Sequence, residues 1–336
     1  MRDDGAAVVD RGRYPDAVTP WERESWRAAA LDWVGGLLAA RGLVVDGAPW
    51  VRLRPWSVLM RVPLAGRAPV WFKASPPSGA FEGPLTAALA RWVPGQVLCP
   101  LAVDAGRGWM LLPDGGESFR TVLDREPVGP REWEALLRQY AGLQYDLVPH
   151  ADEIERLGVP AARTADLPEV FEGLVAVNRA LGPDERARLE GLRPRLADWC
   201  AELAAVGVPD TLDHADLHDG QLFRPAPGRF TFFDWGDAAV SHPFAGLRVT
   251  AERARDRYGP RVLPRLLDAY LEPWTGTGRT SAELRRAADL AWRLSSLGRA
   301  AAWGRMFPDA SGARPGAVEG ARSLLELLAE PPRAAG

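Results

Sequence analysis

The sequence predicts an α+β protein of two lobes, in which a small β-rich lobe precedes a larger, mainly helical one. Three observations carry this prediction. Apolar residues alternate with polar ones between Val51 and Phe72, which is the period of half-buried strands. Apolar residues recur at helical spacing through most of the chain after residue 130. Between the two regions, the turn sequence Pro-Asp-Gly-Gly at 113–116 interrupts both patterns.

The first third of the chain gives the β-rich N-lobe. Residues 1–20 carry glycine, proline and charge without periodicity, so we expect a loose N-terminal arm there. The N-lobe is then expected over 21–113, as a β-sheet with helices, one of them the main helix. The predicted elements are a helix at 21–41, strands near 51–53, 58–62 and 70–72, a helix at 81–92, and strands near 97–103 and 109–112.

The remainder gives the helical C-lobe, expected over 121–336 and joined to the N-lobe by a hinge or linker at 114–120. Residues 208–237 interrupt its helices and are typical of short strands and loops. The cleft between two separate cores is the natural ligand site. Helices are predicted at 130–145, 167–180, 183–206, 245–257, 260–272, 281–304 and 316–329.

The composition excludes some classes of partner. Over 336 residues the formal net charge is −3 and acidic and basic residues are interleaved, so neither nucleic acid nor an anionic membrane is expected as a partner. The most apolar early stretch is too short and interrupted to span a bilayer. The two cysteines, Cys99 and Cys200, lie far apart without metal-ligand spacing, which favours a reducing, cytoplasmic location.

One polar cluster stands out inside the irregular region. Residues 213–221 read Asp-His-Ala-Asp-Leu-His-Asp-Gly-Gln, and an apolar strand then leads into Asp-Trp-Gly-Asp at 234–237. Crowded carboxylates repel one another, and a bound cation would offset that repulsion. The amide of Gln221 follows Asp216 by five residues, which is the spacing of the catalytic Asp and the metal-binding amide in protein kinases. Carboxylate and amide oxygens are ligands that suit magnesium.

These two stretches resemble the aminoglycoside phosphotransferase/choline kinase family, whose signature is His-Gly-Asp-Leu-His-x-x-Asn followed by Asp-Trp or Asp-Phe. The resemblance implies a two-lobed, protein-kinase-like fold and an ATP-dependent phosphotransferase with ATP and Mg²⁺ as cofactors. It implies that Asp216 orients the acceptor hydroxyl, that His214 braces the catalytic turn, and that Gln221 and Asp234 hold magnesium. We expect a monomer or homodimer.

The resemblance extends into the N-lobe. The strand that carries Lys73 is similar to the kinase strand whose lysine holds the nucleotide phosphates, and Glu82 is the candidate ion-pair partner that orients it. The strand at 109–113 is similar to the hinge strand, so the backbone of Leu111 and Leu112 is expected to bind the adenine. Ser57, in the sequence Arg-Pro-Trp-Ser at 54–57, is the candidate phosphate-loop residue.

Three departures from the family pattern are visible. Gln221 replaces the metal-binding Asn and is longer by one methylene group. No Gly-x-Gly-x-x-Gly precedes Lys73. Downstream, Ser-His-Pro at 241–243 stands where the family has Gly-Asp-Pro, so one polar contact that supports the metal loop is not assured.

The acceptor is left open by the sequence. The resemblance implies a small hydroxylated molecule such as an aminoglycoside or other antibiotic, a sugar or an amino-alcohol, with antibiotic resistance as one role. Trp274, Trp292 and Trp303 are candidates for stacking on it. Two other interpretations stay open: a degenerate, non-catalytic nucleotide-binding protein, and a metallohydrolase with His214, Asp216 and His218 as ligands.

Overall fold

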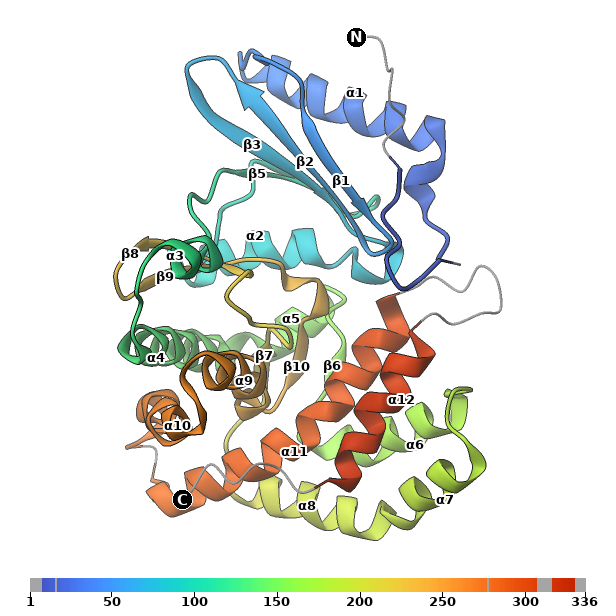
Figure 1. The fold of residues 1–336 in the computed structure, drawn as a ribbon, viewed down its shortest axis with the longest axis vertical. Coiled ribbons are helices and arrows are strands. Elements are labelled where there is room, and N and C mark those ends of the chain that lie inside the picture. The colour runs from blue at the N-terminus through green and yellow to red at the C-terminus, as the bar shows by residue number, and fades with distance from the viewer. Residues whose placement is uncertain (1–7, 16, 277, 307–315, 330–336) are drawn as a thin grey trace.

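The computed structural model describes residues 8–15, 17–276, 278–306 and 316–329. The N-lobe is built on one antiparallel sheet of five strands in the order β1-β2-β3-β5-β4 (Figure 1). The sheet confirms the predicted β-rich first lobe. Its strands are β1 (Trp50–Arg54), β2 (Ser57–Leu64), β3 (Arg67–Ala74), β4 (Ala102–Asp104) and β5 (Trp109–Pro113).

Helix α1 (Glu24–Ala40) covers one face of this sheet through aromatic packing. The ring of Trp26 lies 5.5 Å from that of Trp109, and the ring of Trp33 lies 5.9 Å from that of Phe72, both edge to face. Edge-to-face pairs at these distances are favourable beyond the area that they bury. The aromatic cluster therefore fixes α1 against the sheet and leaves the opposite face of β3 turned toward the other lobe.

The N-terminal arm differs from the loose segment expected. Val9, Tyr14 and Ala17 are buried, and the amide of Asp10 donates to the carbonyl of Leu53 on β1 at 2.9 Å. The few apolar side chains of this polar segment pack against other parts of the protein. Periodicity within the segment cannot predict such packing. Residues 1–7 and 16 of the expected arm lie outside the described residues.

The C-lobe contains the remaining helices (Figure 1). The predicted helix at 183–206 is two helices, because Gly191 and Pro194 interrupt it. The expected linker at 114–120 is shorter, since a helix capped by the side chain of Ser118 begins at Phe119. The helices are α3 (Phe119–Arg125), α4 (Pro130–Leu147), α5 (Ala151–Arg156), α6 (Leu167–Val177), α7 (Pro183–Gly191), α8 (Arg193–Ala205), α9 (Leu247–Tyr258), α10 (Leu263–Leu271), α11 (Ser281–Met306) and α12 (Ala317–Leu325).

Helix α2 (Glu82–Trp92) joins the two lobes. It lies between β3 and β4 of the N-lobe sheet in the chain, yet Leu85 and Leu89 are buried in the core of the C-lobe. Figure 1 shows α2 between the sheet and the helical lobe. Its first residue, Glu82, is thereby held at the junction of the lobes.

The irregular region folds into short strands that present the polar cluster. Strand β7 (Thr211–Asp213) lies in a small sheet beside β10 (Ala239–Ser241), which also pairs with β6 (Ala161–Ala162). Strands β8 (Leu222–Ala226) and β9 (Arg229–Phe232) form a hairpin. The turns after β7 and after β9 therefore lie side by side. Throughout the described part of the chain, every helix is too short or too polar to cross a membrane.

Candidate active site

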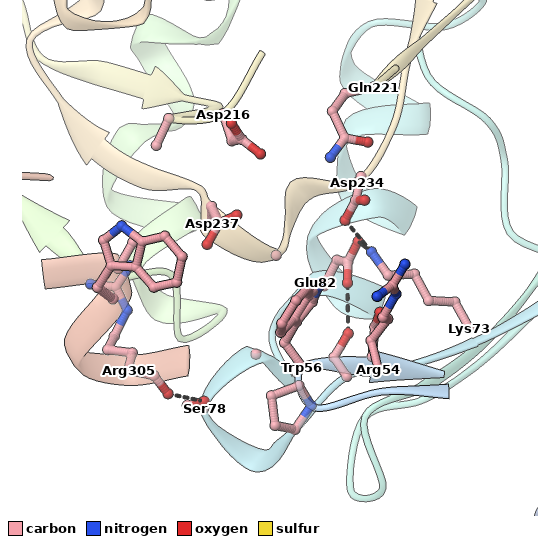
Figure 2. Close-up of a pocket in the computed structure, with 18 of the residues that line it drawn as sticks. Arg54, Trp56, Lys73, Ser78, Glu82, Asp216, Gln221, Asp234, Asp237 and Arg305 are labelled. Carbon is pink, nitrogen blue, oxygen red and sulfur yellow. Dashed lines mark hydrogen bonds and ion pairs between the residues drawn. The ribbon is translucent and has the colours of Figure 1, made fainter. Parts of the chain in front are cut away.

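A cavity of about 630 Å³ lies where the sheet, α2 and the turns after β7 and β9 meet. A volume of this size is typical of small-molecule sites. Part of its lining is drawn in Figure 2. The cavity brings together most of the residues expected from the sequence, namely Ser57, Lys73, Glu82, Asp216, Gln221 and Asp234.

Lys73 faces this cavity because strand alternation turns it away from the aromatic core. Its neighbour Phe72 is buried under α1, so Lys73 projects from the opposite face of β3. The ammonium nitrogen Nζ lies 2.5 Å from Oε1 of Glu82 and also contacts Oδ1 of Asp234 (Figure 2). Glu82 is held in turn by the hydroxyl of Ser75, which donates to its Oε2 at 2.7 Å.

Lys73 and Asp234 each keep the other group ionised. Burial would lower the pKa of the Lys73 ammonium, but the carboxylates of Asp234 and Glu82 raise it above its ordinary value. Burial would likewise raise the pKa of Asp234, but the Lys73 ammonium lowers it. Both groups therefore stay ionised at neutral pH.

Hydrogen bonds of C-lobe side chains hold the turn after β7 in place. The phenol of Tyr140 donates to Oδ1 of Asp213 at 3.1 Å and accepts from the amide of His214 at 2.9 Å. Nε2 of His214 donates to the carbonyl of Phe233 at 2.8 Å, which ties this turn to the end of β9. His214 is fully buried and absent from the cavity lining, so it holds the turn in place and does not face a ligand.

Asp216 projects from this turn into the cavity. Its side chain is 44% exposed, yet partial burial and then the charges of Asp237 and Asp234 raise its pKa to about 7. His218 lies 3.7 Å from it, but burial and the charge of Arg120 lower the pKa of His218 to about 4. The imidazole is therefore neutral near pH 7, and it does not form an ion pair with Asp216. Its Nδ1 accepts from the amide of Gly220 at 2.9 Å.

A third carboxylate adds to the crowding. Burial, and then the charge of Asp234, raise the pKa of Asp237 to about 6. The side chain of Gln221 acts in the opposite direction and lowers the pKa of both Asp216 and Asp234. Three neighbouring carboxyl groups and a side-chain amide whose oxygen could turn toward them provide the kinds of ligand that a hard divalent cation takes.

A cation here would need ligands from a bound molecule as well. Among the described residues, no group of three His, Cys, Asp or Glu side chains is placed to hold a metal by itself. His214 and His218 bond to backbone groups in different directions, which does not support the metallohydrolase interpretation. Asp234 and Gln221 fit magnesium when phosphate oxygens complete its coordination.

Two of the expected nucleotide-binding residues are not brought into the cavity. Leu111 and Leu112 are buried within β5, and the carbonyl of Leu111 accepts from the amide of Leu101 at 2.7 Å. Strand β5 is paired on both sides, with β3 and with β4, so Leu111 has no backbone group to spare. Trp274 and Trp292 are also buried away from the cavity. Of the three tryptophans considered for stacking, Trp303 alone lines it.

The cavity also contains residues that sequence reasoning missed, at the C-terminal end of α11. Arg299, Ala302 and Arg305 line it together with Trp303. The spacing of 299, 302 and 303 places three of them on one helix face. Arginines on a helix that is otherwise mainly buried are the signal that could have indicated a ligand-facing end.

The N-terminal arm packs against two residues of the cavity lining, Trp56 and Trp303. The ring of Tyr14 lies 5.9 Å from Trp56 on the β1–β2 turn and 6.0 Å from Trp303 on α11. The hydroxyl of Ser78 donates to the carbonyl of Arg305 at 2.7 Å (Figure 2). Two contacts thus join the lobes at the mouth of the cavity.

A paired lysine on the N-lobe sheet and an acidic turn opposite it define a small-molecule phosphotransferase with a two-lobed, protein-kinase-like fold. Residues 70–301 match the model of the phosphotransferase enzyme family, and the chain belongs to that family. The match runs from the strand of Lys73 into α11, and it confirms the resemblance drawn from the polar cluster. No curated protein sequence matches the chain significantly.

Solved structures share the fold. The apoenzyme of macrolide 2′-phosphotransferase MphH from Brachybacterium faecium is 20% identical, with a TM-score of 0.57, over 88% of this chain and 98% of that one. The GDP complex of aminoglycoside 2′-phosphotransferase-IIIa is 14% identical, with a TM-score of 0.54, over 88% and 97%. Choline kinase LicA from Streptococcus pneumoniae is 13% identical, with a TM-score of 0.51, over 89% and 100%.

Proposed function

We propose that the protein transfers the γ-phosphate of ATP to a hydroxyl group of a small molecule, with Mg²⁺ as cofactor. The observation that carries the proposal is the convergence of Lys73 and Asp234 beside Asp216 in one cavity between the lobes. The bound GDP of the aminoglycoside phosphotransferase of the same fold supports a nucleotide in the cleft.

Phosphoryl transfer is catalysed mainly by positioning and by neutralising charge. Lys73 would place positive charge on the phosphate oxygens, and Glu82 would fix its direction. Asp234 and Gln221 would hold the magnesium ion, which supplies further neutralisation of the phosphates. Ser57, the first residue of β2, also lines the cavity and would offer its hydroxyl to a phosphate oxygen.

Asp216 would accept a hydrogen bond from the acceptor hydroxyl and aim it at the γ-phosphorus. Its pKa of about 7 lies near the operating pH, where an acid–base group works best. Nucleotide binding would be expected to lower that pKa when magnesium offsets the neighbouring carboxylates.

The test is an acceptor screen with γ-labelled ATP that compares the wild-type protein with Asp216→Ala. We expect the variant to bind nucleotide normally and to lose transfer by about 100-fold or more. Asp219→Asn is the matched control, because Asp219 lies in the same turn but pairs with Arg120 at 2.6 Å. Transfer by Asp216→Ala at the wild-type rate would remove Asp216 from the mechanism, and ATP binding without turnover would favour the non-catalytic alternative.

A further inference from the structure

The cavity has two sides, which Figure 2 separates. Lys73, Gln221 and Asp234 lie on one side, and Asp216, Asp237 and Arg305 lie on the other. The first side is the one proposed above for the nucleotide phosphates and the metal. On that proposed function, the acceptor enters on the second side, between Asp216 and the end of α11.

The wall of this acceptor side carries two arginines, Arg299 and Arg305. Arg299 pairs with Glu326, which also pairs with Arg248 at 2.6 Å, and Arg248 has Glu252 at 3.0 Å as well, so this cluster is balanced in charge. Arg305 forms no side-chain hydrogen bond or ion pair with any other described residue. Burial lowers the pKa of Arg305, although an arginine remains charged at every physiological pH.

An alternative explanation is that the carboxylate of Asp237 neutralises the charge of Arg305. The charge of Asp237 does act on Arg305, but the two side chains form no ion pair within 4.0 Å. A guanidinium group has five N–H donors arranged to bind carboxylate or phosphate oxygens in pairs. Arg305 lines the cavity and its donors have no partner among the described side chains, so they are available to a ligand there.

The acidic residues of the cavity lead to the same conclusion. Its lining contains four carboxylates, namely Glu82, Asp216, Asp234 and Asp237. Glu82 and Asp234 are bound to Lys73. Only Asp216 and Asp237 remain for an acceptor, whereas a polycationic acceptor needs several carboxylates besides the catalytic one.

We propose that the acceptor is a hydroxylated small molecule with an anionic group, a carboxylate or a phosphate, which binds Arg305 while its hydroxyl lies at Asp216. The indole of Trp303, on the same wall, covers the apolar face of the molecule. A polycationic aminoglycoside fits this side poorly, because besides Asp216 it would find only Asp237 to pair with its ammonium groups.

The test uses three sugars that share one ring and differ in charge: glucuronate, glucose and glucosamine. Binding is measured by calorimetry with Mg²⁺ and a non-hydrolysable ATP analogue, and transfer is measured with labelled ATP. We expect glucuronate to bind about tenfold more tightly than glucose, with glucosamine the weakest. Ribose and ribose 5-phosphate form a second pair, which distinguishes a phosphate from a carboxylate as the preferred anion.

Arg305→Gln should reduce the preference for the anionic sugar to about threefold or less. Arg286→Gln is the matched control: it lies on the same helix outside the cavity, paired with Glu202, and should keep the full preference. Equal binding of the sugars, no binding of either anion, or an unchanged preference in Arg305→Gln contradicts the inference. Asp216-dependent transfer to glucosamine would overturn it while leaving the phosphotransferase proposal intact.

Discussion

The ammonium group of Lys73 forms an ion pair with Asp234, although 161 residues separate them along the chain. The pair joins the N-lobe sheet to the acidic turn of the C-lobe directly. On the proposed function, a nucleotide that enters with magnesium would exchange this contact for phosphate oxygens, and until then Lys73 and Asp234 neutralise each other.

Replacing Lys73 by Met should abolish transfer and destabilise the protein by about 3–5 kcal/mol, because Glu82 is left buried without its partner. Urea unfolding and phosphate transfer measure the two effects. The double variant Lys73→Met/Glu82→Gln should recover much of the stability and none of the activity. A double variant that regained activity, or a single variant as stable as the wild type, would contradict the role of this pair.

Removal of magnesium should stop transfer, and adding it back should restore it, since Asp234 and Gln221 fit the ion only with phosphate oxygens beside them. Asp234→Asn should raise the Mg²⁺ concentration needed for half-maximal transfer by about tenfold or more, because a charged ligand is lost. Titration of Mg²⁺ at saturating ATP measures this. An unchanged requirement in Asp234→Asn, with Asp219→Asn as control, would place the metal elsewhere.

Stability should fall on mild acidification because of His242. Its Nδ1 accepts from the amide of Phe244 at 3.2 Å, and burial lowers its pKa to about 3. The unfolded chain takes up this proton near pH 6.5, so the contribution is complete above pH 6.5 and is lost as the pH falls toward 3, by about 2 kcal/mol at pH 5. The variant His242→Asn removes the titrating imidazole and keeps a side-chain acceptor for the amide of Phe244.

Urea unfolding at pH 7.5 and pH 5.0 compares the two proteins. The variant should lose about 2 kcal/mol less than the wild type between these values. Equal losses in both proteins would show that other groups cause the acid sensitivity.

The N-terminal arm should contribute to both stability and acceptor binding. Tyr14 is 7% exposed and contacts Trp56 and Trp303, so Tyr14→Ala should cost about 3 kcal/mol of unfolding free energy and raise the KM for the acceptor more than it lowers kcat. Val8→Ala is the control in the same arm, since Val8 is 81% exposed. Wild-type stability in Tyr14→Ala would mean that the arm is loose, as its sequence suggests.

The convergence of the polar cluster in one cavity could be predicted because its residues are close together in the sequence. Asp216 and Gln221 lie five residues apart in one turn, and Asp234 follows one short hairpin later. Lys73 could be placed because strand alternation fixes its direction relative to Phe72. What these residues share is that a few neighbouring positions determine where each side chain points.

The remaining features depend on contacts between distant segments. Amphipathic spacing predicted the helix at 281–304, but it did not reveal that the last turn of that helix would meet Ser78 across the cleft. The arm at residues 8–20 has no period of its own, so its packing could not be foreseen. Leu111 was expected at the adenine because the strand at 109–113 is similar to the kinase hinge strand, whereas pairing of β4 with β5 could not be read from that strand alone.

Among the described residues, Ala215 and Asp234 are the non-glycine residues with positive φ, at 63° and 67°. Both line the cavity between the lobes, and the family signature has glycine where this chain has Ala215. Each such conformation costs about 1–3 kcal/mol and persists only when its surroundings enforce it. The conformation of these two turns is therefore enforced by the surrounding fold and is not the one that their own residues favour. We therefore expect activity to be lost under conditions that are too mild to unfold the whole chain.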